Sequence, residues 1–315
     1  MGGRDGVCWA AAISRAQMQN RVRFLAEDQG ERRQDVPASV VALLRGRRFV
    51  VLTGAGCSTD SGIPDYRGPH GSLRRRQPIQ YQDFLRSPTA RARYWTRSLI
   101  GWPQLAAARP NGIHDALARL EQAGLCCGII TQNVDGLHTR AGSRRVVELH
   151  GSLHAVRCLG CAERLPRETL QHELAALNPG WVTHTAALAP DGDAEVESPL
   201  GGGAAFVVPP CRACGGLLKP DVVFFGENVA RSVVDAAWQL FSEASALLIL
   251  GSSLAVYSGF RFARGAAERG LPIALVNMGP TRADDLAALR VEAPLSPTME
   301  FLCQQLVPTS SELAD

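Results

Sequence analysis

Lysine is almost absent from this chain. It occurs only at position 219, although lysines and arginines together number 33. So strong a preference for arginine is typical of a GC-rich genome, and it indicates a bacterial source rather than a function. The net charge is only +3, which argues against a dedicated nucleic-acid binder. No apolar run approaches the roughly 20 residues that cross a bilayer, so we expect a soluble protein with no membrane partner.

The N-terminus lacks the marks of a targeting segment. A mitochondrial transit peptide is poor in acidic residues, whereas the first 35 residues carry several, and no secretory apolar region is visible. We therefore interpret residues 1–35 as a non-essential extension. The expected location is the cytoplasm, with the mitochondrial matrix as the alternative.

The chain also lacks a disulfide framework. Four of its nine cysteines form two C-x-x-C pairs, Cys158 with Cys161 and Cys211 with Cys214, and the other five follow no pattern. This usage suits a reducing compartment and a bound metal. Zinc binds four thiolates tetrahedrally, and such a shell leaves no open position for catalysis. We expect one structural zinc ion coupled to folding of its module; the alternative is four unrelated core cysteines.

Short β-branched runs alternate with helical patterns along the chain. Four runs have the pattern of buried parallel strands: 49–53, 127–131, 246–250 and 272–277. Helical patterns such as 113–122 and 234–244 separate them. This alternation predicts an α/β fold with a doubly wound parallel sheet. Glycines and small polar residues follow the strands, so the ligand crevice should lie at the carboxyl ends of the strands.

Two stretches interrupt the alternation. Residues 63–110 are rich in Arg, Tyr and Trp and are expected to form a cofactor loop and a small helical module. Residues 152–217 contain the four paired cysteines and are expected to form a zinc ribbon. The rest divides into a Rossmann-like nucleotide-binding domain and a frayed tail: residues 36–62, 111–151 and 218–307 for the domain, and 308–315 for the tail.

Polar and glycine-rich motifs follow two of the strands. In the loop 54–58 (GAGCS) the glycines let the backbone approach a pyrophosphate, and a following helix would offer free N–H groups. The loop departs from the fingerprint G-x-G-x-x-G, and tight backbone packing is the alternative. Beyond the next strand, Asn133 and Asp135 can point to one side of an extended segment, although an Asx-type turn explains the same spacing.

The order of motifs from about Phe49 to about Pro297 resembles the sirtuins, the NAD-dependent protein deacylases. The segments that carry the resemblance are 54–58, 62–68 (GIPDYRG), 132–135 (QNVD), 148–151 (ELHG) and the paired cysteines. The resemblance implies that His150 is the general base, a role that suits a side chain with a pKa near neutrality. His138 and His154 are nearby rivals outside the motif.

The resemblance also implies how NAD is held. Asp135 accepts a hydrogen bond from the nicotinamide amide, Asn133 lies near the ribose and helps to position a water, and Tyr66 and Arg67 cover the ribose. Many relatives have Phe in place of Tyr66. The full expected set of cofactor contacts is Gly54, Ala55, Gly56, Ser58, Asp65, Tyr66, Arg67, Gln132, Asn133, Asp135, Gly251, Ser252, Ser253, Asn277, Met278, Gly279 and Leu295.

Two further segments, 219–227 and 251–257, resemble those that sandwich an extended substrate peptide in sirtuins. Peptide addition between strands relies on backbone hydrogen bonds, so the sequence preference should be loose. The expected substrate contacts are Val223, Phe225, Gly226, Glu227, Val256, Tyr94 and Arg97.

The long insert between the cysteine pairs resembles that of class II sirtuins, including bacterial members and the fourth vertebrate mitochondrial type. Its acidic stretch 191–195 is expected either to reach toward the active site or to form a solvated loop. Tyr94 and Arg97 have helical i, i+3 spacing, and a pair so spaced grips acidic acyl groups such as succinyl in one class of sirtuin. The alternative for this pair is a solvated basic face.

The activity implied is transfer of an acyl group, acetyl above all, from lysine to ADP-ribose with release of nicotinamide. NAD would be a co-substrate, and acylated-lysine proteins or peptides would be the partners, rather than nucleic acid or membranes. The alternatives are a protein mono-ADP-ribosyltransferase, a deacylase that prefers longer or acidic acyl groups, and a non-enzymatic binding module.

Overall fold

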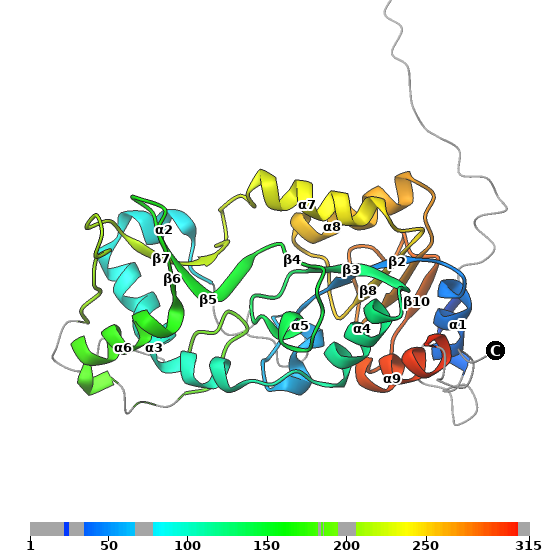
Figure 1. Ribbon diagram of the computed structural model, residues 1–315, viewed down its shortest axis with the longest axis horizontal. Coiled ribbons are helices and arrows are strands. Elements are labelled where there is room, and N and C mark those ends of the chain that lie inside the picture. Colours follow the sequence, from blue (N-terminus) through cyan, green and yellow to red (C-terminus); the bar gives the residue numbers. More distant parts are fainter. Residues whose placement is uncertain are drawn as a thin grey trace, which may run out of the picture.

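The core is a seven-stranded sheet in which every neighbouring pair of strands is parallel (Figure 1). The computed structural model describes residues 22–24, 35–66, 78–181, 184, 186–194 and 206–307. The strands are β1 (Val22–Phe24), β2 (Phe49–Thr53), β3 (Cys126–Thr131), β4 (Val146–Glu148), β8 (Ala246–Leu250), β9 (Ile273–Val276) and β10 (Leu289–Val291). The four expected strands all occur, and the α/β fold is confirmed.

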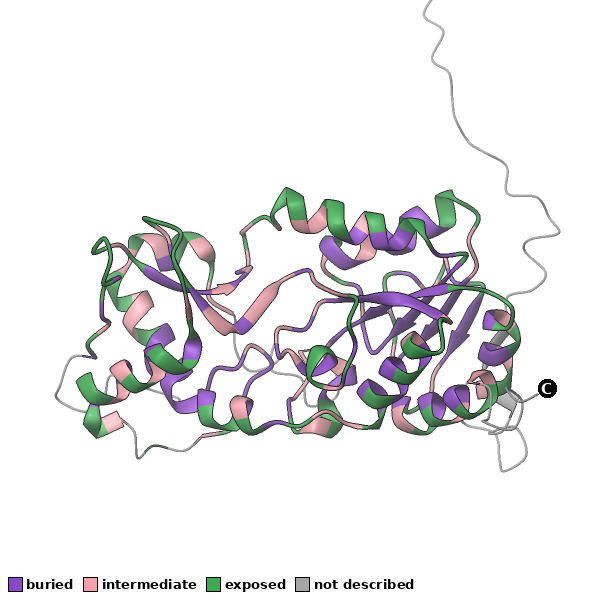
Figure 2. Ribbon diagram, in the orientation of Figure 1, coloured by how far each residue is buried: buried purple, intermediate pink, exposed green. Residues whose placement is uncertain are grey.

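Helices cover both faces of this sheet, as a doubly wound fold requires (Figure 1). One face carries α1 (Asp35–Leu44), α4 (Gly112–Gln122) and α9 (Leu295–Leu306), and the other carries α7 (Arg231–Ser242) and α8 (Tyr257–Glu268). Strands β2, β3, β8 and β9 are buried at every position, because apolar side chains alternate between two helix layers (Figure 2). Each layer forms its own apolar cluster against the sheet.

The strand order is β1-β10-β9-β8-β2-β3-β4, so the chain winds outward in both directions from β2. The chain passes from β2 to β3 and β4 on one side, and then returns to β8, β9 and β10 on the other. The loops that leave β2 and β8 therefore diverge at a topological switch point, where open α/β sheets bind their ligands.

A smaller lobe is built from the two segments that interrupt the alternation. It contains α2 (Tyr81–Arg86), α3 (Pro88–Ala107), α6 (Arg167–Leu177) and an antiparallel sheet of β5 (Gly151–Cys158), β6 (Arg164–Pro166) and β7 (Leu218–Val222). The helical and cysteine-containing segments share a single apolar cluster that includes Trp95, Leu153 and Leu170. They fold as one packed body rather than as two separate modules.

Two details differ from the sequence expectations. Strand β1 lies within the stretch expected to be an extension, and it pairs with β10 at the edge of the sheet. The glycine loop leads into two short 3₁₀ turns, Ala55–Cys57 and Thr59–Ser61, rather than into a long helix. In the described part of the chain, none of the helices has the length and apolar character to cross a membrane.

Candidate active site

A cavity of about 1180 Å³ lies at the carboxyl ends of β2, β3, β8 and β9, between the two lobes. This is the place expected for the ligand crevice. The predicted residues that line it are Gly54, Ala55, Gly56, Ser58, Asp65, Tyr66, Tyr94, Gln132, Asn133, Asp135, His150, Val223, Phe225, Gly226, Glu227, Gly251, Ser252, Ser253, Val256, Asn277, Met278, Gly279 and Leu295. Of the predicted cofactor and substrate residues, Arg67 lies outside the described part of the chain, and Arg97 is not among the residues that line the cavity.

The glycines after β2 are explained by close contact with the loop after β8. A Cβ atom on Gly54 would lie 2.7 Å from the Gly251 carbonyl oxygen, and one on Gly56 would lie 2.9 Å from the Gly251 Cα. The Gly56 N–H also donates to the Gly251 carbonyl at 3.0 Å. Tight packing is therefore one reason for these glycines, and the packed loops also form one wall of the cavity.

Ser58 joins the two polar residues that follow β3. Its hydroxyl donates to Asp135 Oδ2 at 2.7 Å and accepts from Asn133 Nδ2 at 3.1 Å. The other Asp135 oxygen accepts the N–H of Leu137 at 2.9 Å. All three polar side chains are buried, and buried polar groups that are mutually satisfied hold a fixed geometry.

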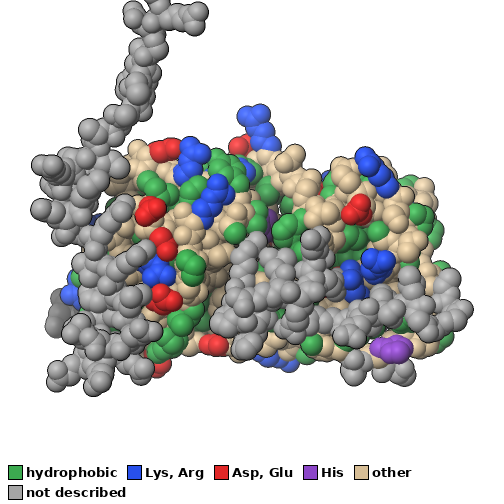
Figure 3. All heavy atoms as spheres, turned by 180° about the vertical axis from the view of Figure 1, so that it is seen from behind, with side chains coloured by type: hydrophobic (Ala, Val, Ile, Leu, Met, Phe, Trp, Pro, Cys, Tyr) green, Lys and Arg blue, Asp and Glu red, His purple; other side chains and the backbone are tan. Residues whose placement is uncertain are grey.

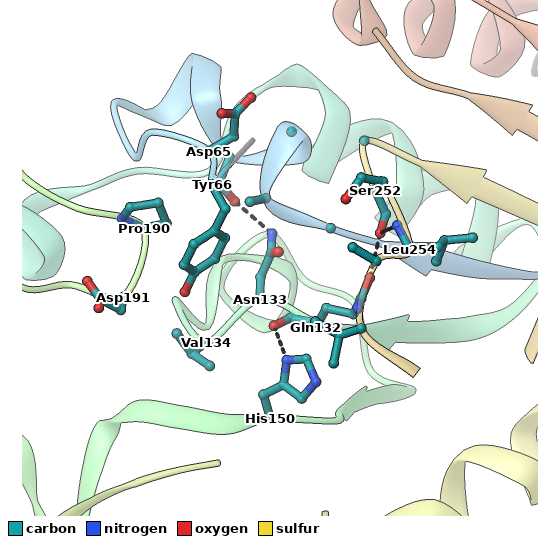
Figure 4. Close-up of a pocket in the computed structure, with 18 of the residues that line it drawn as sticks. Asp65, Tyr66, Gln132, Asn133, Val134, His150, Pro190, Asp191, Ser252 and Leu254 are labelled. Atoms are coloured by element: carbon teal, nitrogen blue, oxygen red, sulfur yellow. Dashed lines mark hydrogen bonds between the residues drawn. The ribbon is translucent and has the colours of Figure 1, made fainter. Parts of the chain in front are cut away.

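His150 is fixed in one tautomer by its surroundings. Its Nδ1 lies 2.9 Å from the Gln132 carbonyl oxygen, which can only accept, so Nδ1 carries the proton. Nε2 is then an acceptor and receives the Ser258 hydroxyl at 2.7 Å. Burial lowers the pKa of His150, and the hydrogen bond to Gln132 acts in the opposite direction. A neutral imidazole with an unprotonated Nε2 at a cavity wall is a competent general base. Figure 4 shows His150 and Asn133 beside the same space.

The two rival histidines are placed differently. His138 is 2% exposed, contacts the Thr53 hydroxyl at 2.9 Å and packs at a tilt against the His114 ring, and burial lowers its pKa to about 3. His154 Nε2 donates to the Asp135 carbonyl oxygen at 2.9 Å, so its ring supports that loop. Neither His138 nor His154 is among the residues that line the cavity.

The loop after β9 is held by a group of charged residues. Arg290 donates to the Gly279 carbonyl oxygen at 2.9 Å and pairs with Asp284 and Glu292. Glu292 in turn accepts the Gly279 N–H at 2.9 Å. Asn277 closes the turn by donating to the Met278 carbonyl oxygen at 3.0 Å. The rigid loop leaves Met278 largely exposed at the cavity rim.

The segment 223–227, which lines the cavity, is hydrogen-bonded to the backbone of His150. The Val223 N–H donates to the His150 carbonyl oxygen at 2.8 Å, and the Tyr81 N–H donates to the Phe225 carbonyl oxygen at 2.9 Å. The single lysine lies beneath this segment: Lys219 is 4% exposed, pairs with Glu227 at 3.0 Å and donates to the Val222 carbonyl oxygen. Lys219 therefore holds both ends of the segment expected to bind a peptide, through Val222 and Glu227.

The four paired cysteines converge at the far end of β5 and β7. Their sulfur atoms all lie within 4.8 Å of one another, with 3.4 Å between Cys158 and Cys214 and 3.8 Å between Cys161 and Cys211. A tetrahedral zinc site with Zn–S bonds of about 2.3 Å has sulfur atoms about 3.8 Å apart. The residues fit one zinc ion with a closed thiolate shell.

Tyr94 and Arg97 do not form a solvated face. Both are buried, and the Arg97 guanidinium pairs with Asp193 of the insert at 3.6 Å. Pro190 and Asp191 of the same insert line the cavity near Tyr66 (Figure 4). The described part of the acidic stretch therefore reaches the site; Glu195 lies outside the described residues.

Sequence reasoning missed Ser258, Pro190 and the partner of Arg97. Ser258 lies in the first turn of α8, and 108 positions separate it from His150. Only the tertiary fold brings them together. Asp193 was visible as part of an acidic stretch, but nothing in its spacing indicated a partner on α3.

The chain was compared with known proteins. The model of the Sir2 family matches residues 54–258. An "NAD-dependent protein deacetylase 2" of Bradyrhizobium diazoefficiens is 55% identical over 258 residues, which cover 82% of this chain and 94% of that protein. An "NAD-dependent protein deacetylase" of Xanthomonas campestris is 54% identical over 271 residues, 86% of this chain and 92% of that protein.

Solved structures agree with this relationship. A Sir2 protein with a deacetylated p53 peptide and 3'-O-acetyl ADP ribose superposes with a TM-score of 0.69 and 31% identity, covering 86% of this chain and 99% of the other. A Sir2 complex with p53 peptide and NAD+ gives a TM-score of 0.64 at 31% identity, covering 85% and 97%.

Proposed function

Because the chain belongs to the Sir2 family, we propose that it is an NAD-dependent protein deacetylase. It would transfer the acetyl group of an acetyl-lysine to ADP-ribose and release nicotinamide. The observation that carries the proposal is the pairing of two features at one cavity: an unprotonated His150 Nε2, and a fixed Ser58–Asp135–Asn133 network.

In this proposal the polar network grips the nicotinamide end of NAD. Asp135 is held on both oxygens by Ser58 and Leu137, so its remaining lone pairs keep one direction and can accept from an amide N–H. Asn133 lies beside them and would hold a ribose or a water molecule. The packed glycine loops line the cavity and would approach the phosphates closely because Gly54 and Gly56 lack side chains, although the Gly56 N–H itself donates to the Gly251 carbonyl oxygen. The 277–279 loop would hold the adenosine end.

His150 would take a proton from a ribose hydroxyl at Nε2. The hydroxyl of Ser258 occupies that lone pair at 2.7 Å, so a substrate hydroxyl would take its place. The Gln132 carbonyl oxygen would stabilise the imidazolium that forms, because it accepts from Nδ1 in either protonation state. NAD supplies the electrophilic ribose carbon, and the protein supplies the base, the orientation and the exclusion of water.

The substrate would be an acetylated lysine on a protein or peptide. The edges of 223–227 and 251–256 flank the cavity next to His150, and an extended peptide between them would bind through its backbone. The four clustered cysteines would hold a structural zinc that shapes the 218–222 strand leading into this segment. The curated relatives named above are bacterial, which supports a cytoplasmic location.

The proposal is tested by incubating the protein with NAD and a peptide carrying acetyl-lysine. Mass spectrometry should find the free lysine, nicotinamide and O-acetyl-ADP-ribose in equal amounts, and no turnover without NAD. A protein acceptor that gains ADP-ribose while the peptide keeps its acetyl group would instead identify a mono-ADP-ribosyltransferase.

A further inference from the structure

The first turns of helix α8 present a single basic side chain to the cavity. Arg261 is the only arginine or lysine among the described residues that line it. Figure 3 shows the surface hollowed between the two lobes, with basic side chains on the parallel-sheet lobe beside the hollow. None of the hydrogen bonds assigned above to the base or to the nicotinamide network involves Arg261, so its role lies elsewhere in the cavity.

The helix places Arg261 on the side that meets His150. Ser258, three positions earlier, shares this side of α8, and its hydroxyl donates to His150 Nε2 at 2.7 Å. Gly259 lies on another side, where an added Cβ would lie 2.6 Å from Nε2 of Gln132, whose amide oxygen accepts from the loop after β8. Arg261 follows Gly259 by two residues, roughly 200° around the helix. It therefore points away from the loop that would approach the phosphates.

A tyrosine holds the guanidinium in position. Tyr257, one turn before Arg261, also lines the cavity and is 47% exposed. The Arg261 Cζ lies 5.3 Å from the centroid of its ring, within the range of a cation–π contact. The Tyr257 hydroxyl accepts from Arg264 at 3.3 Å on the same helix. An exposed aromatic ring held in this way gives Arg261 a defined place at the cavity rim.

The charge of Arg261 is not compensated, unlike that of its neighbours. Within the described part of the chain, no carboxylate pairs with Arg261, and its buried Nε–H has no acceptor. Arg264 pairs with Glu268 at 3.0 Å. Glu227, on the segment expected to bind a peptide, is already paired with Lys219 at 3.0 Å. A buried donor without an acceptor is costly, so Arg261 is ready for an acceptor that a ligand brings.

We propose that Arg261 binds an acidic side chain of the substrate close to the acetyl-lysine, so that the enzyme prefers acetylation sites flanked by Asp or Glu. The proposal rests on the deacetylase function and narrows its substrate class. A guanidinium can donate two parallel hydrogen bonds to one carboxylate. This preference would add to the backbone recognition of an extended peptide.

The distance along the helix indicates which peptide positions are involved. The acetyl-lysine must reach His150, and Arg261 lies about 4.5 Å further along α8 than Ser258, which contacts that histidine. Successive residues of an extended peptide are about 3.3 Å apart. The acidic residue should therefore lie within about two positions of the acetyl-lysine.

The experiment uses acetyl-lysine peptides of one sequence that carry either Glu or Gln at each of the two positions before and after the lysine. The proteins are wild type, Arg261→Gln, Arg261→Lys and Arg264→Gln. Arg264 is the matched control, because it lies on the same side of α8 but is paired with Glu268.

For at least one position, the wild type should cleave the Glu peptide with a kcat/KM about threefold to tenfold above that of the Gln peptide. This range lies between the contribution of an exposed ion pair and that of a hydrogen bond to a charged group. Arg261→Gln should lose the difference, Arg261→Lys should keep part of it, and Arg264→Gln should keep it. Added salt should reduce the difference, because it screens the charges.

The KM for NAD separates a peptide contact from a contact with the phosphates of the cofactor. If Arg261→Gln raises the KM for NAD and leaves the peptide preference intact, the proposal is overturned. Equal kcat/KM for all Glu and Gln peptides in the wild type also overturns it. Peptide binding is measured by calorimetry as well. Absence of turnover with every peptide would refute the deacetylase function, whereas tighter binding of a Glu peptide that is lost in Arg261→Gln would still support the role of Arg261.

Discussion

Removing the metal should unfold the small lobe and leave the parallel sheet intact. The four sulfur atoms join β5 to the loop before β7, and Cys158 and Cys211 belong to the apolar cluster of that lobe. Neither apolar cluster of the parallel sheet includes a described residue between 151 and 217. The perturbation is chelation, or the substitution Cys158→Ala.

The expected loss of folding free energy is large relative to the stability of the small lobe. Structural zinc contributes about 10–16 kcal/mol to the folding of finger peptides at neutral pH, whereas a whole domain is stable by about 5–15 kcal/mol. Half of the zinc contribution, about 5–8 kcal/mol, already matches the lower part of that range, so its loss should be enough to unfold the lobe. The sheet keeps its own two clusters, so its stability should change little.

Hydrogen exchange followed by mass spectrometry resolves the two lobes. Elemental analysis of the wild type should find one zinc per chain. After zinc removal, the amides of β5, β6 and β7 should exchange rapidly, those of β2, β3 and β8 should stay protected, and peptide deacetylation should be lost. Cys303→Ala serves as the control, because this buried cysteine lies outside the four-cysteine site. A metal-free protein with full activity and unchanged exchange in β5–β7 would refute a structural zinc.

Three further predictions follow from the geometry of the site. In Ser258→Ala, His150 loses the hydroxyl that donates to its neutral form. The pKa of His150 should therefore rise, and the acid limb of the kcat/KM profile should move to higher pH. On that limb kcat/KM should fall by about threefold to tenfold. An unmoved limb would contradict this role of Ser258. His138 has a folded pKa of about 3 against about 6.5 in the unfolded chain. Between these values only the unfolded chain binds the proton, so urea titrations should show stability falling with decreasing pH by up to about 1.4 kcal/mol per unit, and less steeply in His138→Gln. Lys219→Arg should overfill the space beneath Val222 and Phe224, lowering stability by about 1–3 kcal/mol and raising KM for the peptide; normal melting and KM would show that a guanidinium fits.

The sequence was informative wherever a local pattern encodes the structure. The strands could be predicted because β-branched runs end at glycines or polar residues, and the cysteine cluster because its spacing suits one metal. His150 could be singled out because its motif, 148–151, resembles that of the sirtuins. Each strand, each C-x-x-C pair and the 148–151 motif is a short contiguous segment, so the sequence alone is enough to recognise it.

The rest depends on contacts between distant segments. The hydrogen bond from Ser258 fixes the base atom of His150, yet 108 positions separate the two residues. Arg97 was expected either in an acyl pocket or on a solvated face; it is buried and paired with Asp193, which excludes the solvated face. Spacing cannot predict an ion pair between a helix and an irregular insert. Gly54 and Gly56 suggested a phosphate loop, but their close packing against Gly251 requires the strand order to be known.

The central claim is that His150 is the base of an NAD-dependent deacetylase. The measurement is product formation from acetyl-lysine peptide and NAD by wild type and His150→Ala, with folding checked by circular dichroism and NAD binding by calorimetry. We predict that the folded, NAD-binding variant forms O-acetyl-ADP-ribose about 100-fold more slowly or worse, as expected for loss of a general base. Turnover near that of the wild type in the folded variant would contradict the account.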